Sequence, residues 1–274
     1  LPNPNASYMF AHFANLEEID FGDCFDTSNV TNMSAMFYDC RDLTSLDLSS
    51  FDTSNVTNMS DMLHDCRSLT SLNLSGFDTS SVTEMRSMFH GCSSLTSVTM
   101  LEGVITICER AFQNCSSLTS VTIPKGVTKI GVAAFDGCSD LTSVAIPKGV
   151  TNIEAHAFEN CSSLTNVTIP EGVTSIENLA FAGCSRLTSV TIPDGVISIG
   201  GAFYNCSSLT SVTIPNSVTS IDSYAFSRCD RLTNVTIPKG VTSIADSTFF
   251  CCYDLTDVEI PESVTSIGDD AFYN

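Results

Sequence analysis

The residues of this chain whose types and spacing could do chemistry are its cysteines. Thirteen cysteines occur among the 274 residues, and ten of them recur at intervals of 26, then 23 and once 22 residues. These ten form the cysteine ladder: Cys40, Cys66, Cys92, Cys115, Cys138, Cys161, Cys184, Cys206, Cys229 and Cys252. If each interval is one rung of a stack, the sulfur atoms lie in a column about 4.8 Å apart. Such a column could form disulfides between rungs, bind a metal ion, or fill the core with small apolar groups.

Two features favour packing thiols over ligands. The C-x-x-C spacing typical of zinc sites is absent, and Phe13 stands where the first rung would carry its cysteine. A phenylalanine can replace a thiol that packs but not one that binds a metal. The ladder is therefore predicted to consist of buried free thiols. Cys24, Cys108 and Cys251 stand off the ladder, and we expect these three to be exposed or reactive.

The sequence carries no catalytic motif. His64 and His90 occupy equivalent positions in neighbouring repeats and come closest to a metal pair, but two ligands do not make a site. No nucleophile elbow, zinc-protease helix, dinucleotide-binding loop or phosphate loop occurs. Asp269 and Asp270 fall at an expected turn, where aspartate commonly caps a helix. We therefore predict that the protein is not an enzyme and has no metal and no cofactor.

Charge limits the partners. The chain has 31 acidic and 11 basic residues, a formal net charge of −20 and a pI near 4.2. Nucleic acids and anionic membrane surfaces bind through Lys and Arg, so both are disfavoured. No apolar run approaches the roughly 20 residues that span a bilayer, which predicts no membrane insertion. The first residues, LPNPNASYMF, resemble no leader peptide, and we expect any secretion signal to have been removed or to lie upstream.

The elements that position these residues follow from the repeat itself. In CSSLTSVTIPKGVTKIGVAAFDGC, residues 115–138, the apolar Leu118, Val121 and Ile123 predict a short strand with one buried side. Proline and glycine end that strand, and a second short extended piece follows. The spacing of the small and apolar residues in VAAFDGC, residues 132–138, predicts one helical turn that returns the chain to the next strand.

Eleven leucines open these strands, so we expect eleven rungs: Leu16, Leu43, Leu69, Leu95, Leu118, Leu141, Leu164, Leu187, Leu209, Leu232 and Leu255. The repeat is 26 residues long over about residues 1–100 and 23 residues long over about 101–274. The chain is predicted to be a single solenoid, residues 1–274. It begins and ends inside a unit, which favours a fragment of a longer array.

The units IPEGVTSIENLAFAGCSRLTSVTIP and FDTSNVTNMSDMLHDCRSLTSLNLS resemble the BspA-type leucine-rich repeats of secreted and surface proteins. The second unit is similar to the repeats of lipoprotein-like members of that group. The resemblance covers almost all of residues 9–274 and implies an α/β repeat solenoid. Its superhelix would be right-handed, with a parallel sheet on the concave face and short helical turns on the convex face. It also implies an extracellular or cell-surface location and a role in adhesion, and it carries over no catalytic residue.

The outward positions of the first strands form what we call the Ser/Thr lane. Its members are Thr119, Ser120, Thr122, Thr142, Ser143, Thr165, Asn166, Thr168, Thr188, Ser189, Thr191, Thr210, Ser211, Thr213, Thr233, Asn234 and Thr236. Such a lane could hydrogen-bond a protein or a glycan, or it could reflect only the preference of threonine for strands. A flat threonine lattice could also bind ice, but the intervening Ser and Asn and the expected curvature disfavour this.

Carboxylates break the lane toward both ends. The acidic patches are Glu17, Glu18, Asp20 and Asp47 in the first two rungs and Asp257, Glu259 and Glu262 in the last. Stacked carboxylates repel unless a positive group intervenes, so weakly bound Ca²⁺ or a basic partner would fit. The alternative is that the charge serves only solubility.

We therefore predict a non-catalytic adhesion or protein-interaction module of the cell surface or extracellular space. Its partner would be an extracellular protein or glycan, such as a matrix or host protein, bound on the concave lane. The alternative is a passive structural spacer or self-assembling surface element with no specific ligand.

Overall fold

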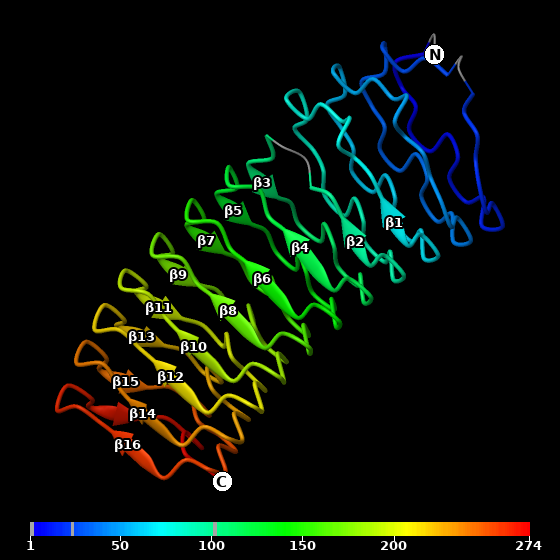
Figure 1. Cartoon of the computed structure of the whole chain (residues 1–274). Coiled ribbons are helices and arrows are strands. Elements are labelled where there is room, and N and C mark those ends of the chain that lie inside the picture. The colour runs from blue at the N-terminus through cyan, green and yellow to red at the C-terminus, as the bar shows by residue number, and fades with distance from the viewer. Residues whose placement is uncertain (1–2, 23–24, 101–102) are drawn as a thin grey trace.

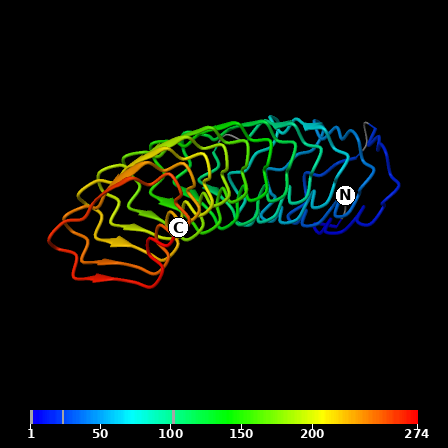
Figure 2. The ribbon, with the colours of Figure 1, turned by 90° about the horizontal axis from the view of Figure 1, so that it is seen from below.

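The computed structural model describes residues 3–22, 25–100 and 103–274. The chain winds into a stack of similar rungs with the two termini at opposite ends (Figure 1). The stack curves along its length (Figure 2). Because each rung contacts mainly its neighbours, this is the architecture of a repeat solenoid.

Within the described residues, eight rungs carry two short strands each. The first strands are β2 (Ser97–Val98), β4 (Ser120–Thr122), β6 (Ser143–Ala145), β8 (Asn166–Thr168), β10 (Ser189–Thr191), β12 (Ser211–Thr213), β14 (Asn234–Thr236) and β16 (Asp257–Glu259). The second strands are β3 (Thr106–Ile107), β5 (Lys129–Ile130), β7 (Asn152–Ile153), β9 (Ser175–Ile176), β11 (Ser198–Ile199), β13 (Ser220–Ile221), β15 (Ser243–Ile244) and β17 (Ser266–Ile267). An earlier rung contributes β1 (Ser71–Leu72).

Every strand pairing is parallel and joins equivalent residues of neighbouring rungs. Ser120 pairs with Ser143, and Ser143 pairs with Asn166. The second strands form a six-stranded sheet in the order β13-β11-β9-β7-β5-β3 and a further pair, β15-β17. The first strands divide into β1-β2, β4-β6-β8, β10-β12 and β14-β16. The 26-residue rungs stack through isolated parallel bridges at Asn5, Asn32, Asn58 and Glu84.

One hydrophobic core runs through the stack, from Ala6 to Ala271. The predicted inward residues of each rung are buried, including Leu118, Val121 and Ile123. A column of phenylalanine rings, one from each rung, runs along the axis of the stack and so across the strands. The rings of Phe135 and Phe158 are 5.2 Å apart with planes 4° apart. Stacking supplies the burial that no single rung could achieve, which is why the unit is repeated.

The expected helical turns are wrong, because the described residues contain no helix. Between residues 131 and 138 the chain forms successive β-turns, in which the N–H of Ala134 donates to the carbonyl of Gly131 at 3.2 Å. The N–H of Ala133 donates instead to Ala155 of the next rung at 3.0 Å, and its φ is +53°. Since alternate amides bond to the neighbouring rung, they are not available for the i to i−4 bonds of a helix. The segments that were predicted to be helical are therefore turns.

The ten cysteines of the ladder are buried and free, as predicted. The Sγ of Cys138 donates to the carbonyl oxygen of Phe112, one rung earlier, at 3.2 Å, and the other ladder thiols make the same contact. Burial raises the pKa of Cys92 and of Cys206 to about 12. The thiols therefore act as small packing groups with one hydrogen bond each.

The other thiol predictions have mixed outcomes. Cys24 lies outside the described residues. Cys108 and Cys251 are half-buried, and burial raises the pKa of Cys108, which opposes the reactive thiolate. Phe13 is 56% exposed at the end of the stack, so it does not pack in place of a thiol.

Candidate functional site

The Ser/Thr lane is the regular polar surface that the first strands present. Its seventeen positions are all exposed, while the residue between them in each strand, such as Val121 and Val144, is buried. This alternation follows from the period of two along a strand. The structure therefore brings the predicted lane residues together in neighbouring rows across the rungs.

The lane contains two kinds of threonine. The hydroxyl of Thr142 donates to the backbone carbonyl of Thr119, one rung earlier, at 3.3 Å. In the described residues, eight threonines at this rung position bond in this way to the preceding rung: Thr44, Thr96, Thr119, Thr142, Thr165, Thr210, Thr233 and Thr256. These hydroxyls reinforce the stacking of rungs, a structural role that the sequence analysis missed. The L-T pair that begins at ten of the eleven strand-opening leucines was the available signal.

The remaining lane side chains are free to contact a partner. In the described part of the chain, the side chains of Ser120, Thr122, Ser189 and Thr191 make no hydrogen bond within the protein. The same holds for Ser143, Asn166, Thr168, Ser211, Thr213 and Thr236. Asn234 is the exception among the described lane residues at these positions, since its side-chain amide donates to the hydroxyl of Thr233 at 3.2 Å. Together they offer hydroxyl and amide groups at a spacing of about 4.8 Å per rung.

The lane opens at one step, between β8 and β10. These strands belong to different sheets. In the described residues, neither the N–H nor the hydroxyl of Thr188 bonds to the carbonyl of Thr165, although the step before has both bonds, from Thr165 to Thr142. The step between β12 and β14 also separates two sheets but keeps both bonds, from Thr233 to Thr210. We call this step, which lacks both bonds, the opening of the lane; the second strands of the same two rungs, β9 and β11, remain paired.

A surface hollow lies at this opening. It is lined by Asn166, Val167, Thr168, Ile169, Glu171, Ser189, Thr191 and Pro193. Three hydroxyls, one amide and one carboxylate thus surround a small apolar floor. Glu171 was not among the predicted site residues, and it follows the strand in the P-x-G turn.

The acidic patches are exposed but do not form stacked carboxylates at the C-terminal end. Asp257 pairs with Asn234, and Glu259 pairs with Thr236. In the N-terminal patch, Asp47 accepts the N–H of Ser49 at 2.9 Å, which lowers the pKa of its carboxyl. Glu17, Glu18 and Asp20 are exposed in the first rung. No group of three or more His, Cys, Asp or Glu in the described ranges could hold a metal ion.

The two histidines of neighbouring rungs are brought together as stacked rings. The ring centroids of His64 and His90 are 4.3 Å apart, and Tyr38 stacks on His64 at 4.6 Å. Both Nδ1 atoms are buried without a hydrogen bond. The lone pair of an imidazole nitrogen lies in the plane of its ring, so two rings stacked with centroids 4.3 Å apart do not direct their nitrogens at one metal at the usual distance of about 2.1 Å. Burial and the neighbouring His64 lower the pKa of His90.

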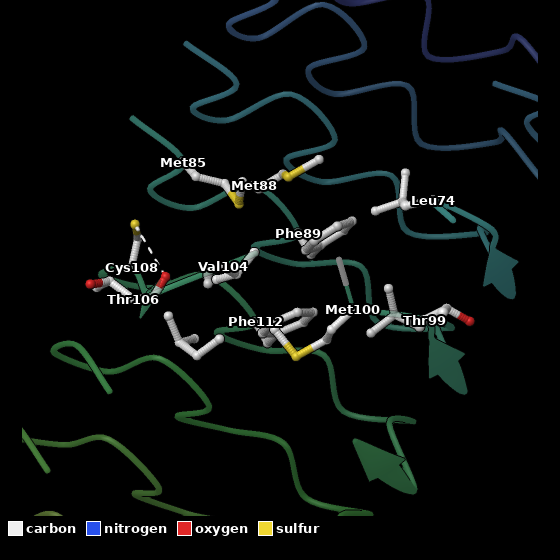
Figure 3. Close-up of a pocket in the computed structure, with 13 residues that line it drawn as sticks. Leu74, Met85, Met88, Phe89, Thr99, Met100, Val104, Thr106, Cys108 and Phe112 are labelled. Carbon is white, nitrogen blue, oxygen red and sulfur yellow. Dashed lines mark hydrogen bonds between the residues drawn. The ribbon is translucent and has the colours of Figure 1, made fainter. Parts of the chain in front are cut away.

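An apolar cavity of about 30 Å³ lies where the 26-residue and 23-residue rungs meet. Met85, Met88, Val104 and Met100 surround the stacked rings of Phe89 and Phe112 (Figure 3). The 26-residue rungs carry an additional buried phenylalanine, such as Phe77, that the next rung does not repeat. The cavity is far smaller than the pockets of about 300–1,000 Å³ that bind small molecules. It is a packing defect of the junction.

The fold places the protein in the structural class of parallel leucine-rich-repeat solenoids. The family model for the BspA type leucine rich repeat region matches residues 85–202 and 175–274. A second model, described as a Mycoplasma protein of unknown function, DUF285, matches residues 4–122. Since the first model covers residues 85–274, more than half of the chain, the protein belongs to the BspA-type leucine-rich-repeat family. Leucine-rich repeats of this kind are typically non-catalytic.

Solved bacterial structures are similar in fold. A leucine rich cell surface protein from Faecalibacterium prausnitzii A2-165 is 27% identical, with 85% of this chain and 77% of that chain covered and a TM-score of 0.51. A leucine-rich repeat protein from Eubacterium ventriosum ATCC 27560 is 20% identical, with 90% and 80% covered and a TM-score of 0.59. The pneumococcal vaccine antigen PcpA is 17% identical, with 88% and 72% covered and a TM-score of 0.55. No curated protein matches the chain. No helix in the described residues is long and apolar enough to cross a bilayer.

Proposed function

We propose that the protein is a non-catalytic adhesion module of the cell surface or extracellular space that binds a protein or glycan through its Ser/Thr lane. In this proposal the lane lies on the concave face of a right-handed solenoid. The observation that carries the proposal is the exposed row of hydroxyl and amide groups without partners inside the protein, on a rigid stack of rungs. A rigid, preorganised surface lowers the entropic cost of binding. The family, and a similar cell surface protein, support the location.

The experiment measures binding of the chain to extracellular-matrix proteins, plasma proteins and glycans by biolayer interferometry, with and without Ca²⁺. The test variant carries Asn166→Lys, Thr168→Lys and Thr191→Lys. The matched control carries Thr151→Lys, Thr174→Lys and Thr242→Lys, which are exposed positions beside the second strands. Both variants add three positive charges, so their difference reports the position of the change.

Binding that is lost in the lane variant and kept in the control supports the proposal. Equal binding by both variants would show that the partner does not bind at the Ser/Thr lane. If no partner is bound by the unsubstituted chain, a passive spacer becomes the better description. A requirement for Ca²⁺ would support the prediction of a weak calcium site near the acidic patches.

A further inference from the structure

The turns beside the hollow between β8 and β10 are acidic, whereas the two preceding turns of the same row carry lysine and the following turn carries the uncharged Asn216. The middle position of the P-x-G turn is Lys125, Lys148 or Lys239 in other rungs of the 23-residue type. At the opening, the same position is Glu171 and, one rung later, Asp194. All five side chains are exposed. The charge of this row therefore changes sign between the rungs of β6 and β8, one step before the opening, and both turns that flank the opening are acidic.

The two acidic turns lie against each other. A Cβ built on Gly195, beside Asp194, would be 3.8 Å from the backbone oxygen of Glu171. In the described part of the chain, neither carboxylate has an ion pair or a hydrogen bond inside the protein. Two unpaired carboxylates on neighbouring rungs repel each other, and a cation between them relieves that repulsion.

The lining of the hollow favours an organic cation over a metal ion or a sugar. Asn166, Thr168, Ser189 and Thr191 add oxygen acceptors around Glu171. No cluster in the described residues has the His, Cys, Asp and Glu ligands for a metal ion. The lane positions are Ser, Thr and Asn, so they offer no aromatic ring on which a sugar could stack. A planar guanidinium presents five N–H donors that match a carboxylate and several hydroxyl oxygens at once.

We propose that this hollow receives an arginine side chain from the protein partner, with the guanidinium between Glu171 and the hydroxyls of Thr168 and Thr191. The net charge of −20 favours a cationic partner at longer range. This inference rests on the proposed function, because it names the chemistry of the partner at one point of the Ser/Thr lane.

The test titrates the protein with N-acetyl-arginine amide as the probe at low ionic strength. Binding is measured from the ¹⁵N–¹H chemical shifts of the protein by NMR. We expect saturable shifts of the Asn166 side-chain amide and of the backbone amides of Thr168 and Thr191. N-acetyl-citrulline amide, which has a similar shape but no charge, should give no saturable shift. Glu171→Gln should weaken binding of the arginine probe about fivefold, the size expected for one exposed charge pair. Glu262→Gln, at the same turn position of the last rung, should leave it unchanged.

Three results would overturn the inference: no saturable shift, shifts spread evenly over the exposed carboxylates, or equal weakening by both variants. Thermal unfolding of both variants serves as the control for folding. If the arginine probe fails while the lane variant still abolishes binding of a matrix protein, the proposed function stands and only the arginine subsite is wrong. If the probe binds as expected but the lane variant keeps its partner, the hollow binds a guanidinium group, and the proposed binding of a partner through the lane is wrong.

Discussion

The Sγ of Cys161 lies 3.2 Å from the backbone carbonyl oxygen of Phe135, one rung earlier in the stack. Cys161 is fully buried, and so is the ring of Phe135. The thiol therefore satisfies a carbonyl of its neighbour while it fills the space beside the phenylalanine column. This contact recurs up the whole ladder and joins each rung to the one before it.

The ladder thiols should be protected from thiol reagents while the chain is folded. Their burial denies access, and it raises the pKa of thiols such as Cys92 to about 12, so little thiolate exists at pH 8. We expect the half-buried Cys108 and Cys251 to react first and the ten ladder cysteines to react only in denaturant. Mass spectrometry after alkylation counts the modified sites. Rapid labelling of Cys161 in the folded chain would contradict the packing role.

The same burial predicts unfolding at alkaline pH. The unfolded chain loses its thiol protons near pH 9, whereas the folded chain holds those of Cys206 and Cys252 up to about pH 12. Above pH 9 the unfolded state therefore binds fewer protons, and stability falls as the pH rises. Each such thiol costs about 1.4 kcal/mol per pH unit in this range. Circular dichroism should show a steep loss of structure above pH 9, and a flat profile up to pH 11 would refute the linkage.

Truncation in the phenylalanine column should cost the most stability. Phe158 is fully buried and stacks on Phe135 and Phe181 at 5.2 and 5.3 Å. We expect Phe158→Ala to lower the free energy of unfolding by about 3–5 kcal/mol. Phe158→Leu should cost less, because Leu63 occupies the equivalent position in a 26-residue rung. Denaturant titration measures both, and equal losses would mean that stacking geometry rather than volume governs the site.

The two kinds of lane threonine should respond differently to loss of the hydroxyl. Thr142→Val removes the hydrogen bond to the carbonyl of Thr119, so stability should fall by about 0.5–1.5 kcal/mol. Thr122 makes no such bond, and Thr122→Val should leave stability nearly unchanged. The free energies of unfolding of the two variants provide the comparison. An equal effect at both positions would show that the ladder hydroxyls do not hold the rungs together.

Acidification should destabilise the histidine stack. Burial and the neighbouring His64 lower the pKa of His90, so below pH 6.5 the unfolded chain binds more protons than the folded chain and stability falls. Asp65 opposes this effect and Arg110 adds to it. His90→Gln removes the titrating group. Glutamine is compatible with this position, because Gln113 occupies the equivalent position in the next rung. We expect the melting temperature of this variant to change less between pH 7 and pH 5. An unchanged pH dependence would place the titration elsewhere.

The structure of a single rung could be predicted from the amino-acid sequence, because its signals are local and repeated. The spacing of Leu118, Val121 and Ile123 specified a strand with one buried side, and the cysteine at a fixed point of each repeat specified a column of buried thiols. Periodicity of this kind translates directly into which side chains face the core. It also pointed to a family of repeats that is typically non-catalytic.

The contacts between rungs could not be predicted in this way, because they depend on how whole rungs stack. The turn at residues 131–138 is not helical because its alternate amides bond to the next rung, a competition that the spacing of Ala134 and Phe135 does not reveal. Likewise, Thr142 and Thr122 are both exposed threonines of the Ser/Thr lane. The hydroxyl of Thr142 bonds to the preceding rung and that of Thr122 does not, a difference that the residue type does not reveal. The opening at Thr188 and the hollow beside Glu171 arise in the same way, from the stacking of whole rungs rather than from any single repeat.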